Sequence, residues 1–327
     1  MKFSGPGVDR AGEGAYNRVT GEIIMAFLTA YLRALRLPFL TGSLLPVAVG
    51  AALAYASEHA WDLRLFGLTA LGVAALHLGA NLLNDYYDSF GSDPLNVHVT
   101  PFSGGSRVIQ NQQLSAETVR WMAYSFLTLG VACGLALIYL GRPGVALLGL
   151  FGLLAGYLYS ASPLQLMSLG LGEVTIFLAF GPPLSLGAYY VQTGSFKPAG
   201  AAVGLPLAFL ITAILWINEF PDLKADADAG KNHLVVRLGL RVSRWVYAGL
   251  MLAPFVSLFF LMEFFRLPDL IVAALLPLPL AVKAIRLAWR TPPTDPEFIP
   301  VQALTIQTHA LVGLCLTLAL LYAAWWR

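Results

Sequence analysis

Charged residues and cysteines are both scarce in this chain. Only 12% of the 327 residues are Asp, Glu, Lys or Arg, the net charge is +2, and no basic run is long enough to indicate nucleic-acid binding. The two cysteines, Cys133 and Cys315, stand in apolar stretches without a CxxC spacing. We therefore expect two buried structural thiols, with neither a redox motif nor a nucleic-acid partner.

The N-terminal segment lacks the pattern of a cleaved signal peptide. Residues 1–24 are polar and Gly-rich, and no apolar region follows a basic start. We expect these residues to form a mobile tail, and residues 25–327 to form a single membrane-embedded domain. Apolar residues make up 57% of the chain and the mean hydropathy is +0.70, which is too apolar for two soluble domains.

Apolar stretches long enough to cross a bilayer occur nine times. The fold class predicted is therefore all-α, a multi-pass transmembrane bundle of nine helices around a central cavity. The expected spans are residues 38–57, 63–84, 117–141, 143–160, 171–192, 199–218, 244–262, 267–285 and 302–326. With this count, 15 of the 20 Lys and Arg residues fall on the side of the N-terminus. The positive-inside rule makes that side cytoplasmic, and we expect a cell inner or plasma membrane.

The first concentration of acids follows the second span. Asp85 and Asp88 are spaced to share a helix face, Asn81 and Asn84 precede them, and Asp93 follows a Gly-Ser turn. Acids beside a bilayer are costly and are usually functional, although solvated acids at a helix end are the plain alternative. Downstream, the run from Ser103 to Arg107 offers backbone amides and a guanidinium suited to phosphate oxygens, or an ordinary loop.

The second concentration, about 137 residues later, follows the sixth span. Asp222 and Asp226 lie one helical turn apart, and Lys231 and Arg237 follow them. Those two cations suit a leaving diphosphate, or else they anchor the helix on the cytoplasmic side. Because an apolar helix, an acidic cluster and a Gly-containing basic loop occur in both halves, we expect the two clusters to surround one cavity.

These residue types indicate chemistry on a diphosphate. Oxygen ligands gathered in this way suit Mg²⁺, which typically takes one or two carboxylates together with substrate phosphates. Two ions would stabilise the leaving diphosphate, and departure from an allylic carbon leaves a carbocation that needs a dry, aromatic cavity. The chain offers aromatic residues for that lining, and Tyr157 is the one predicted to be a substrate residue; for any one tyrosine the alternative is interfacial packing. These aromatic residues are Tyr86, Tyr87, Phe90, Tyr157, Tyr159, Tyr189 and Tyr190. Glu173 is a second polar cavity candidate, or else a helix N-terminal carboxylate.

The residues as a set resemble the UbiA superfamily of membrane prenyltransferases. The matching blocks are NLLNDYYDSFGSD at 81–93, FSGGSRVIQ at 102–110, GLGE at 170–173 with FGP at 180–182 and YYVQTG at 189–194, and residues 222–239. Within the superfamily, the GGSRVIQ and YYVQTG blocks and the DxxDxxxxD spacing are most similar to the 1,4-dihydroxy-2-naphthoate polyprenyltransferases of menaquinone synthesis, the MenA branch.

The resemblance implies a nine-helix bundle that binds Mg²⁺ and a polyprenyl diphosphate and opens laterally to lipid. Asp85, Asp88, Asp222 and Asp226 match the family's metal-binding and catalytic positions, with Asp93 as a further metal ligand. Asn81, Asn84, Arg107 and Lys231 match positions expected at the substrate. The chain departs from related sequences at Asn232-His233 and at Glu219-Phe220-Pro221.

The function implied is Mg²⁺-dependent transfer of a polyprenyl group to 1,4-dihydroxy-2-naphthoate with decarboxylation. One alternative keeps the fold and changes the acceptor to 4-hydroxybenzoate, another aromatic compound or a glyceryl phosphate. A second alternative is a secondary transporter, whose ion sites lie near the bilayer midplane at broken helices. The acids here stand at span ends, beside loops that carry Gly and basic residues, which favours the enzyme.

Overall fold

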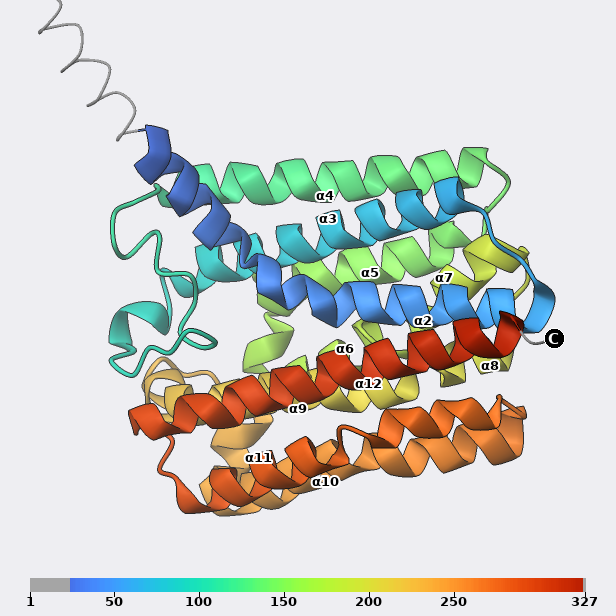
Figure 1. Cartoon of the computed structure of the whole chain (residues 1–327). Coiled ribbons are helices and arrows are strands. Elements are labelled where there is room, and N and C mark those ends of the chain that lie inside the picture. Colours follow the sequence, from blue (N-terminus) through green and yellow to red (C-terminus); the bar gives the residue numbers. More distant parts are fainter. Residues whose placement is uncertain (1–23, 326–327) are drawn as a thin grey trace, which may run out of the picture.

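The computed structural model describes residues 24–325 as a bundle of helices that run side by side (Figure 1). Within these residues there are helices and no strands. The predicted N-terminal tail lies outside the described residues except for residue 24, which begins a helix that extends to residue 35. The predicted all-α fold class is confirmed.

All nine predicted apolar stretches are helical. The structure has eight helices that are long and apolar enough to cross a membrane, together with the shorter apolar helix α5. The α-helices are α2 (Thr41–Glu58), α3 (Leu63–Asp88), α4 (Ala116–Tyr139), α5 (Val145–Ser160), α6 (Gly172–Ala179), α7 (Pro182–Thr193), α8 (Pro198–Ala202), α9 (Leu205–Asp228), α10 (Leu234–Phe265), α11 (Leu278–Arg290) and α12 (Ile299–Trp325). Short 3-10 helices are η1 (Leu37–Leu40), η2 (Asp93–Leu95), η3 (Leu166–Ser168), η4 (Asp269–Leu275) and η5 (Pro296–Phe298).

Two predicted boundaries differ from the structure for identifiable reasons. The span expected at 171–192 is broken between α6 and α7, where Pro182 starts a new helix because it lacks a backbone N–H. The span expected at 244–262 begins ten residues earlier, at Leu234, because α10 continues past the apolar stretch with basic residues. Gly239, with φ of 69°, kinks that extension.

Helix ends are set by local capping. The Asp62 carboxylate accepts hydrogen bonds from the backbone N–H groups of Arg64 and Leu65 at the start of α3, and Ser115 caps α4 through Thr118. Because α3 starts at one end of the bundle, its last turn, which holds Asp85 and Asp88, lies at the other end. The final turns of α9 bring Asp222 and Asp226 to that same end.

Small residues let the helices approach closely enough to enclose a cavity. A Cβ atom at Gly50 of α2 would lie 2.2 Å from the backbone oxygen of Ser185 in α7, so no larger residue fits there. Cys133 of α4 packs in the same way against Gly72 of α3, and both cysteines are free thiols. The largest core cluster lies among α2 and α7–α12, and a second one joins residues 30–34 to α3 and α4.

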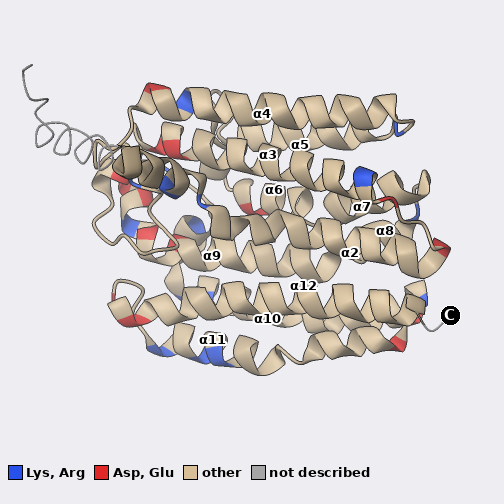
Figure 2. Cartoon of the chain, turned by 45° about the horizontal axis from the view of Figure 1, so that its top comes forward, with Lys and Arg blue, Asp and Glu red and all other residues tan. Residues whose placement is uncertain are grey.

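Charge is gathered at the end of the bundle where α3 and α9 finish. Figure 2 shows acidic and basic residues concentrated there, with few along the middle of the helices. In the described chain, Arg64, Arg142, Lys197 and Arg266 lie at or beyond helix ends on the opposite side. The chain is thus a multi-pass membrane protein with one polar end.

Candidate active site

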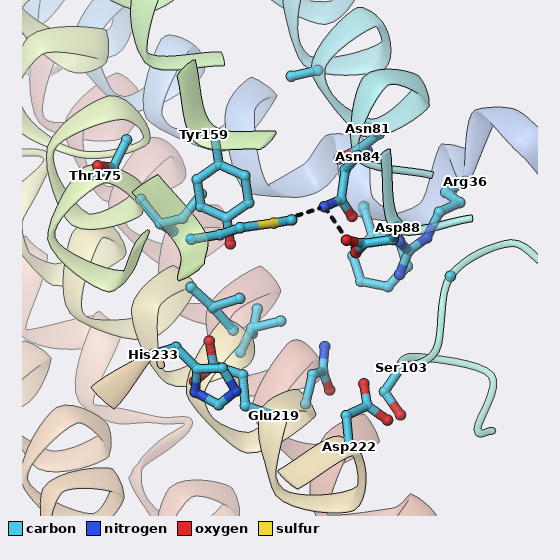
Figure 3. Close-up of a pocket in the computed structure, with 18 of the residues that line it drawn as sticks. Arg36, Asn81, Asn84, Asp88, Ser103, Tyr159, Thr175, Glu219, Asp222 and His233 are labelled. Carbon is cyan, nitrogen blue, oxygen red and sulfur yellow. Dashed lines mark hydrogen bonds and ion pairs between the residues drawn. The ribbon is translucent and has the colours of Figure 1, made fainter. Parts of the chain in front are cut away.

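A cavity of about 230 Å³ lies where the two aspartate-rich segments meet (Figure 3). Residues from α3, α5, α6 and α9 line it, together with the loops that follow α3 and α9. Its polar lining comprises Arg36, His77, Asn81, Asn84, Asp88, Ser92, Asp93, Asn96, Ser103, Tyr159, Thr175, Asn218, Glu219, Asp222, Asp226, Lys231 and His233. The two clusters therefore surround one cavity, as expected from the sequence.

The last turn of α3 supplies two aspartates with different partners. Asp85 is buried beneath the loop, and its two carboxylate oxygens each lie 3.3 Å from the backbone nitrogen of Ser106. Asp88 faces the cavity, accepts a hydrogen bond of 3.2 Å from the Asn84 side chain and pairs with Lys231 at 2.9 Å. The helical spacing thus directs both carboxylates toward the same end of α3.

Asp93 lies in η2, at the edge of the cavity, and is only 4% exposed. Its carboxylate accepts a hydrogen bond of 2.9 Å from the Gln110 side chain, and its backbone oxygen accepts one of 2.6 Å from Arg107. Burial, helped by the negative charges of Asp88 and Asp85, raises the pKa of Asp93 to about 7. A bound cation would reverse this effect, so Asp93 is suited to metal binding.

The Ser103–Arg107 loop contacts the aspartates directly. The Gly104 nitrogen donates to Asp222 at 3.2 Å while the Ser106 nitrogen donates to Asp85, so these amides are bound to carboxylates rather than turned to a phosphate position. Gly104 and Gly105 both have positive φ, and a Cβ at Gly105 would lie 2.9 Å from a carboxylate oxygen of Asp93. Glycine is required here because the backbone lies against the acids.

The second motif closes the cavity from α9. Asp222 accepts a hydrogen bond of 2.7 Å from Asn96, and Asp226 lies 3.2 Å from Nε2 of His233 and 3.5 Å from the Lys231 ammonium. Burial alone would lower the pKa of Lys231, but the carboxylates of Asp88 and Asp226 outweigh it and raise the pKa. Lys231 thus bridges the two motifs as a fixed positive charge.

The aspartates fit a magnesium site by the chemistry of their donors. All five offer oxygen ligands, and the Lys231 ammonium already lies between Asp88 and Asp226 as a single positive charge that pairs with both. Asn84 lies within reach of Asp88, and Asn81 lines the cavity one turn earlier on α3. The geometry therefore brings together the acids, the two asparagines and one lysine.

Four predicted substrate residues lie away from the cavity surface. Arg107 holds the Asp93 backbone, and Arg237 donates to the backbone oxygens of Asn232 and Leu169 at 2.6 and 2.8 Å. Tyr157 packs against the core cluster of α3 and α4. Glu173 is buried behind Glu219 and accepts a hydrogen bond of 2.6 Å from the Leu234 nitrogen. None of the four is among the described residues that line the cavity.

Several cavity residues were not among the predicted site residues. Arg36, which pairs with Asp85 at 3.9 Å, lies far in sequence from any acidic motif. Asn96 lies in a loop without a recognisable pattern. Glu219 and His233 flank the second motif at the two places where the chain departs from related sequences. That departure was the signal that could have identified them.

An apolar cavity of about 160 Å³ continues from the first one, between α3, α4, α5 and α7. The two share His77, Ala80, Gly156, Ala179 and Phe180 as lining residues, so they adjoin without an intervening helix. Glycines, among them Gly134 and Gly152, make up much of the second lining. The site therefore has an acidic end and an apolar extension into the bundle.

Comparison with solved structures supports the fold. An apo UbiA homolog from Aeropyrum pernix superposes with a TM-score of 0.65 at 15% identity, covering 84% of this chain and 96% of that one. A UbiA homolog from Archaeoglobus fulgidus bound to GPP and Mg²⁺ gives a TM-score of 0.57 at 19% identity, covering 86% of this chain and 99% of that one. These neighbours share the helical arrangement described above.

Comparison with known sequences identifies the family. The UbiA prenyltransferase family model matches residues 43–304. UbiA prenyltransferase domain-containing protein 1 from Dictyostelium discoideum is 30% identical over 226 residues, which is 67% of each chain. The proteins of the same name from mouse and human are 32% and 31% identical over 229 residues, covering 69% of this chain and 66% of theirs. This chain belongs to the UbiA prenyltransferase family and is a membrane-bound prenyltransferase.

Proposed function

We propose that this protein transfers a polyprenyl group from an allylic diphosphate to 1,4-dihydroxy-2-naphthoate, with loss of the carboxylate, as a step of menaquinone biosynthesis. The observation that carries the proposal is the meeting of two aspartate motifs across one cavity that continues into an apolar one. An acidic end suits a metal–diphosphate group and an apolar extension suits an isoprenoid chain, so the two features together match a prenyl diphosphate.

Asp85, Asp88, Asp93, Asp222 and Asp226 are proposed to hold two Mg²⁺ ions, with Asn81 and Asn84 beside them. When bound, Mg²⁺ neutralises negative charge on the diphosphate and so makes it a better leaving group. The chain's own contribution is to keep these carboxylates close together, through the Gly104 and Ser106 amides and the Asn96 side chain. Support comes from the Archaeoglobus fulgidus homologs, which were solved bound to Mg²⁺ with DMAPP or GPP.

Lys231 is proposed as the main cationic contact of the diphosphate. It lines the cavity and bridges Asp88 and Asp226. Metal ions bound to those carboxylates would leave the ammonium free to contact the diphosphate. Arg107 and Arg237 are predicted substrate residues that here bind backbone oxygens. We propose that they act by holding Asp93 and the loop before α10, respectively, and so keep the lining in place.

The allylic carbon is proposed to lie in the first cavity near Tyr159, which is three residues along α5 from Gly156, a residue that lines both cavities. Departure of the diphosphate takes the electron pair of the carbon–oxygen bond and leaves an allyl cation, which the aromatic ring and the dry apolar lining stabilise. Tyr159 lines the first cavity, whereas the predicted Tyr157 packs outside it. The polyprenyl tail then occupies the apolar cavity between α3, α4, α5 and α7.

The acceptor is proposed from the resemblance of the Phe102–Gln110 and Tyr189–Gly194 blocks to the MenA branch. The hydroxyls of 1,4-dihydroxy-2-naphthoate push electron density onto a ring carbon, which forms the new bond to the allylic carbon. Loss of the carboxylate as CO₂ then restores the aromatic quinol, with no net loss of a proton. Of these blocks, Tyr189 and Tyr190 are buried in packing rather than at the cavity, so they support a branch assignment and no direct contact.

The polar end of the bundle is proposed to face the cytoplasm from an inner or plasma membrane, with residues 25–327 as one domain. The excess of Lys and Arg at that end supports this orientation. A water-soluble naphthoate would then reach the cavity from the cytoplasm, and the prenyl diphosphate would enter from the lipid.

The test is the stoichiometry of one turnover. Purified protein with Mg²⁺, geranylgeranyl diphosphate and carboxyl-labelled 1,4-dihydroxy-2-naphthoate should release one CO₂ and one pyrophosphate for each prenylated product. The saturated analogue of the diphosphate should compete for binding without reacting, because it cannot form an allyl cation. A product that keeps its carboxylate, or turnover only with 4-hydroxybenzoate or a glyceryl phosphate, would reject the naphthoate acceptor and leave the family assignment in place.

A further inference from the structure

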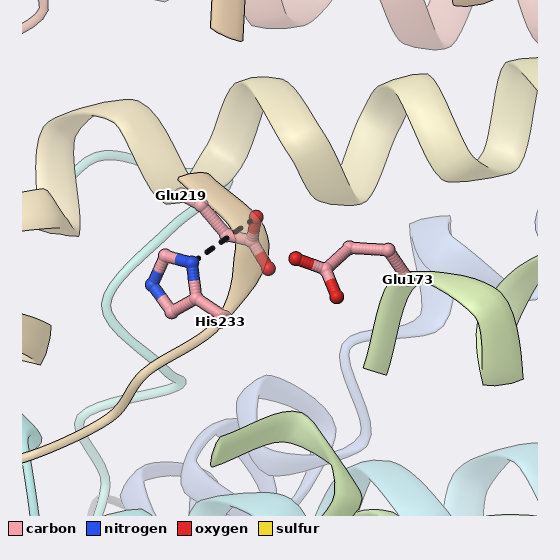
Figure 4. Close-up of side chains that lie close together, drawn as sticks. All are labelled: Glu173, Glu219 and His233. Atoms are coloured by element: carbon pink, nitrogen blue, oxygen red, sulfur yellow. Dashed lines mark ion pairs between the residues drawn. The ribbon is translucent and has the colours of Figure 1, made fainter. Parts of the chain in front are cut away.

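A second cluster of metal-ligating side chains lies behind the aspartates. Glu173 of α6, Glu219 of α9 and His233 at the start of α10 each place one ligand atom within 4.8 Å of the other two (Figure 4). Glu173 is 2% exposed and His233 is 3% exposed, whereas Glu219 is partly buried. Glu219 and His233 line the first cavity, so the cluster forms part of its wall with Glu173 buried behind it. The three residues come from three separate elements, and Figure 4 shows the Glu219 carboxylate between the imidazole and the Glu173 carboxylate.

Each of the three residues has a ligand atom with no hydrogen-bond partner. These atoms are Oε2 of Glu173, Oε2 of Glu219 and Nδ1 of His233. Two further atoms are engaged: Oε1 of Glu173 accepts from the Leu234 nitrogen at 2.6 Å, and Nε2 of His233 lies 3.2 Å from Asp226. Nδ1 of His233 and Oε2 of Glu219 lie 3.6 Å apart, beyond hydrogen-bond distance. Buried polar atoms are nearly always hydrogen-bonded, so three atoms without such a bond at one place indicate a missing ligand.

The charge of the cluster indicates that this ligand is a cation. Two carboxylates lie next to each other, and in the described part of the chain no lysine or arginine forms an ion pair with either of them. Lys231, the nearby ammonium, is paired with Asp88 and Asp226 instead. Buried carboxylates are strongly disfavoured without compensation, which a positive ion at the centre of the three atoms would supply.

We propose that Glu173, Glu219 and His233 bind one Zn²⁺-like first-row transition-metal ion, separate from the Mg²⁺ of the aspartates. Two carboxylates and an imidazole are typical zinc ligands, whereas Mg²⁺ prefers oxygen ligands alone and retains water. Tetrahedral zinc with bonds of about 2.1 Å places its ligand atoms about 3.4 Å apart. The three ligand atoms lie within 4.8 Å of one another, so they would approach one another by about 1 Å to bind the ion.

His233 would connect this ion to the proposed magnesium site. A metal-bound histidine usually donates its second ring N–H to a carboxylate, which fixes its tautomer and its orientation. His233 has this arrangement, with Nδ1 toward Glu219 and Nε2 toward Asp226. The ion would therefore hold His233 as a positioning residue for Asp226, and would join α6, α9 and α10 at the wall of the cavity.

The test is metal content and ligand spectroscopy on the full-length protein in detergent. The protein is stripped with a chelator, reloaded with Zn²⁺ or with Co²⁺ in excess Mg²⁺, desalted and measured by mass spectrometry of the metal. We expect one Zn²⁺ per chain. Glu173→Gln and Glu219→Gln should lower Zn²⁺ affinity by at least about tenfold. Asp88→Asn, in the magnesium motif, and Glu263→Gln, an exposed residue of α10, should retain it.

A second pair of variants addresses loss of folding. His233→Cys keeps a zinc ligand and should add a sulfur-to-metal charge-transfer band to the Co²⁺ spectrum, whereas His233→Asn should bind no Co²⁺ at this site. Absence of bound Zn²⁺ in the reloaded wild type, or unchanged Zn²⁺ affinity in both glutamine variants, would overturn the proposal. Because Zn²⁺ content is read without turnover, this failure is distinguishable from failure of the proposed naphthoate reaction.

Discussion

Lys231 and Asp88 form an ion pair of 2.9 Å that joins the loop after α9 to the last turn of α3. The same ammonium lies 3.5 Å from Asp226, so a single cation links the two aspartate motifs. A metal ion, alone or bound to a diphosphate, would neutralise these same two carboxylates. The ion pair therefore marks the centre of the proposed site. The first expected outcomes concern these carboxylates.

Asp88→Asn should reduce prenyl transfer by at least about a hundredfold, because an amide keeps the shape of the side chain and removes the charge that the metal requires. The measurement is pyrophosphate release by the purified variant at saturating Mg²⁺, alongside its thermal unfolding. Asp228→Asn is the matched control, since Asp228 is an exposed acid at the end of the same motif helix as Asp226 and does not line the cavity. Near-normal turnover of Asp88→Asn would reject the first motif as a metal site.

Gly105→Ala should raise the Mg²⁺ concentration needed for half-maximal activity as well as lower stability. The added Cβ would lie 2.9 Å from Asp93 and 3.3 Å from Asp85, in addition to the cost of about 1–2 kcal/mol for a left-handed backbone. Gly194→Ala separates the two effects, because Gly194 has a similar φ of 75° and no atom near its Cβ. That control should lose stability and keep the wild-type Mg²⁺ requirement. Identical Mg²⁺ curves for both variants would contradict the proposed role of the loop.

Asp93 should make the metal-free protein less stable as the pH rises. Burial raises the pKa of Asp93 to about 7, so the folded protein keeps a proton that the unfolded chain releases from about pH 4 upward. Stability from this group therefore falls between about pH 4 and pH 7 and is lost fully above pH 7. The Asn side chain of Asp93→Asn cannot titrate. In EDTA, the unfolding temperature of this variant relative to that of the wild type should therefore increase as the pH rises across this range. A pH-independent difference between the two proteins would show that Asp93 titrates normally.

Much of this site was accessible from sequence because its determinants are local. The acids of each motif are separated by three or four residues on one helix, and the nine apolar stretches are continuous, so spacing alone places them. Glu173 and Glu219 are different, since nothing between residues 173 and 219 indicates that α6 packs against α9 at that level. Arg36 reaches Asp85 from the turn between the helix that ends at residue 35 and η1, before the predicted spans begin. Contacts of this kind depend on packing between distant segments, which spacing does not encode.

The orientation of the two motif ends can be tested by labelling. Val97, which is 82% exposed after α3, and Ala227 in the last turn of α9 should both react as cysteines with an impermeant reagent from the cytoplasmic side. Tyr139, which is 90% exposed at the other end of α4, should react from the opposite side. Cys133 and Cys315 are replaced first to remove background. Labelling of residues 97 and 227 from opposite faces of the membrane would contradict the proposal that the two motifs share one cavity.

The length of the prenyl chain should depend on the glycines of the apolar cavity. Gly134 of α4 and Gly152 of α5 line that cavity, and a Cβ at either position would meet open space, so leucine fits there and fills the cavity. Gly134→Leu or Gly152→Leu should lower kcat/KM for a long prenyl diphosphate relative to a short one by at least about tenfold. The leucine side chain would occupy the volume that several methylene groups of the long prenyl chain fill in the wild type.

Gly249→Leu provides the control for this experiment. Gly249 is an exposed glycine inside α10 that also has no atom near its Cβ and does not line either cavity, so its ratio of long-chain to short-chain kcat/KM should stay at the wild-type value. Helix propensity changes equally in the three variants, which leaves the filled volume as the difference. A leucine at a fixed depth in the cavity would hinder only prenyl chains long enough to reach it. If the leucine variants reduce kcat/KM for long and short diphosphates equally, the prenyl chain must therefore be bound elsewhere.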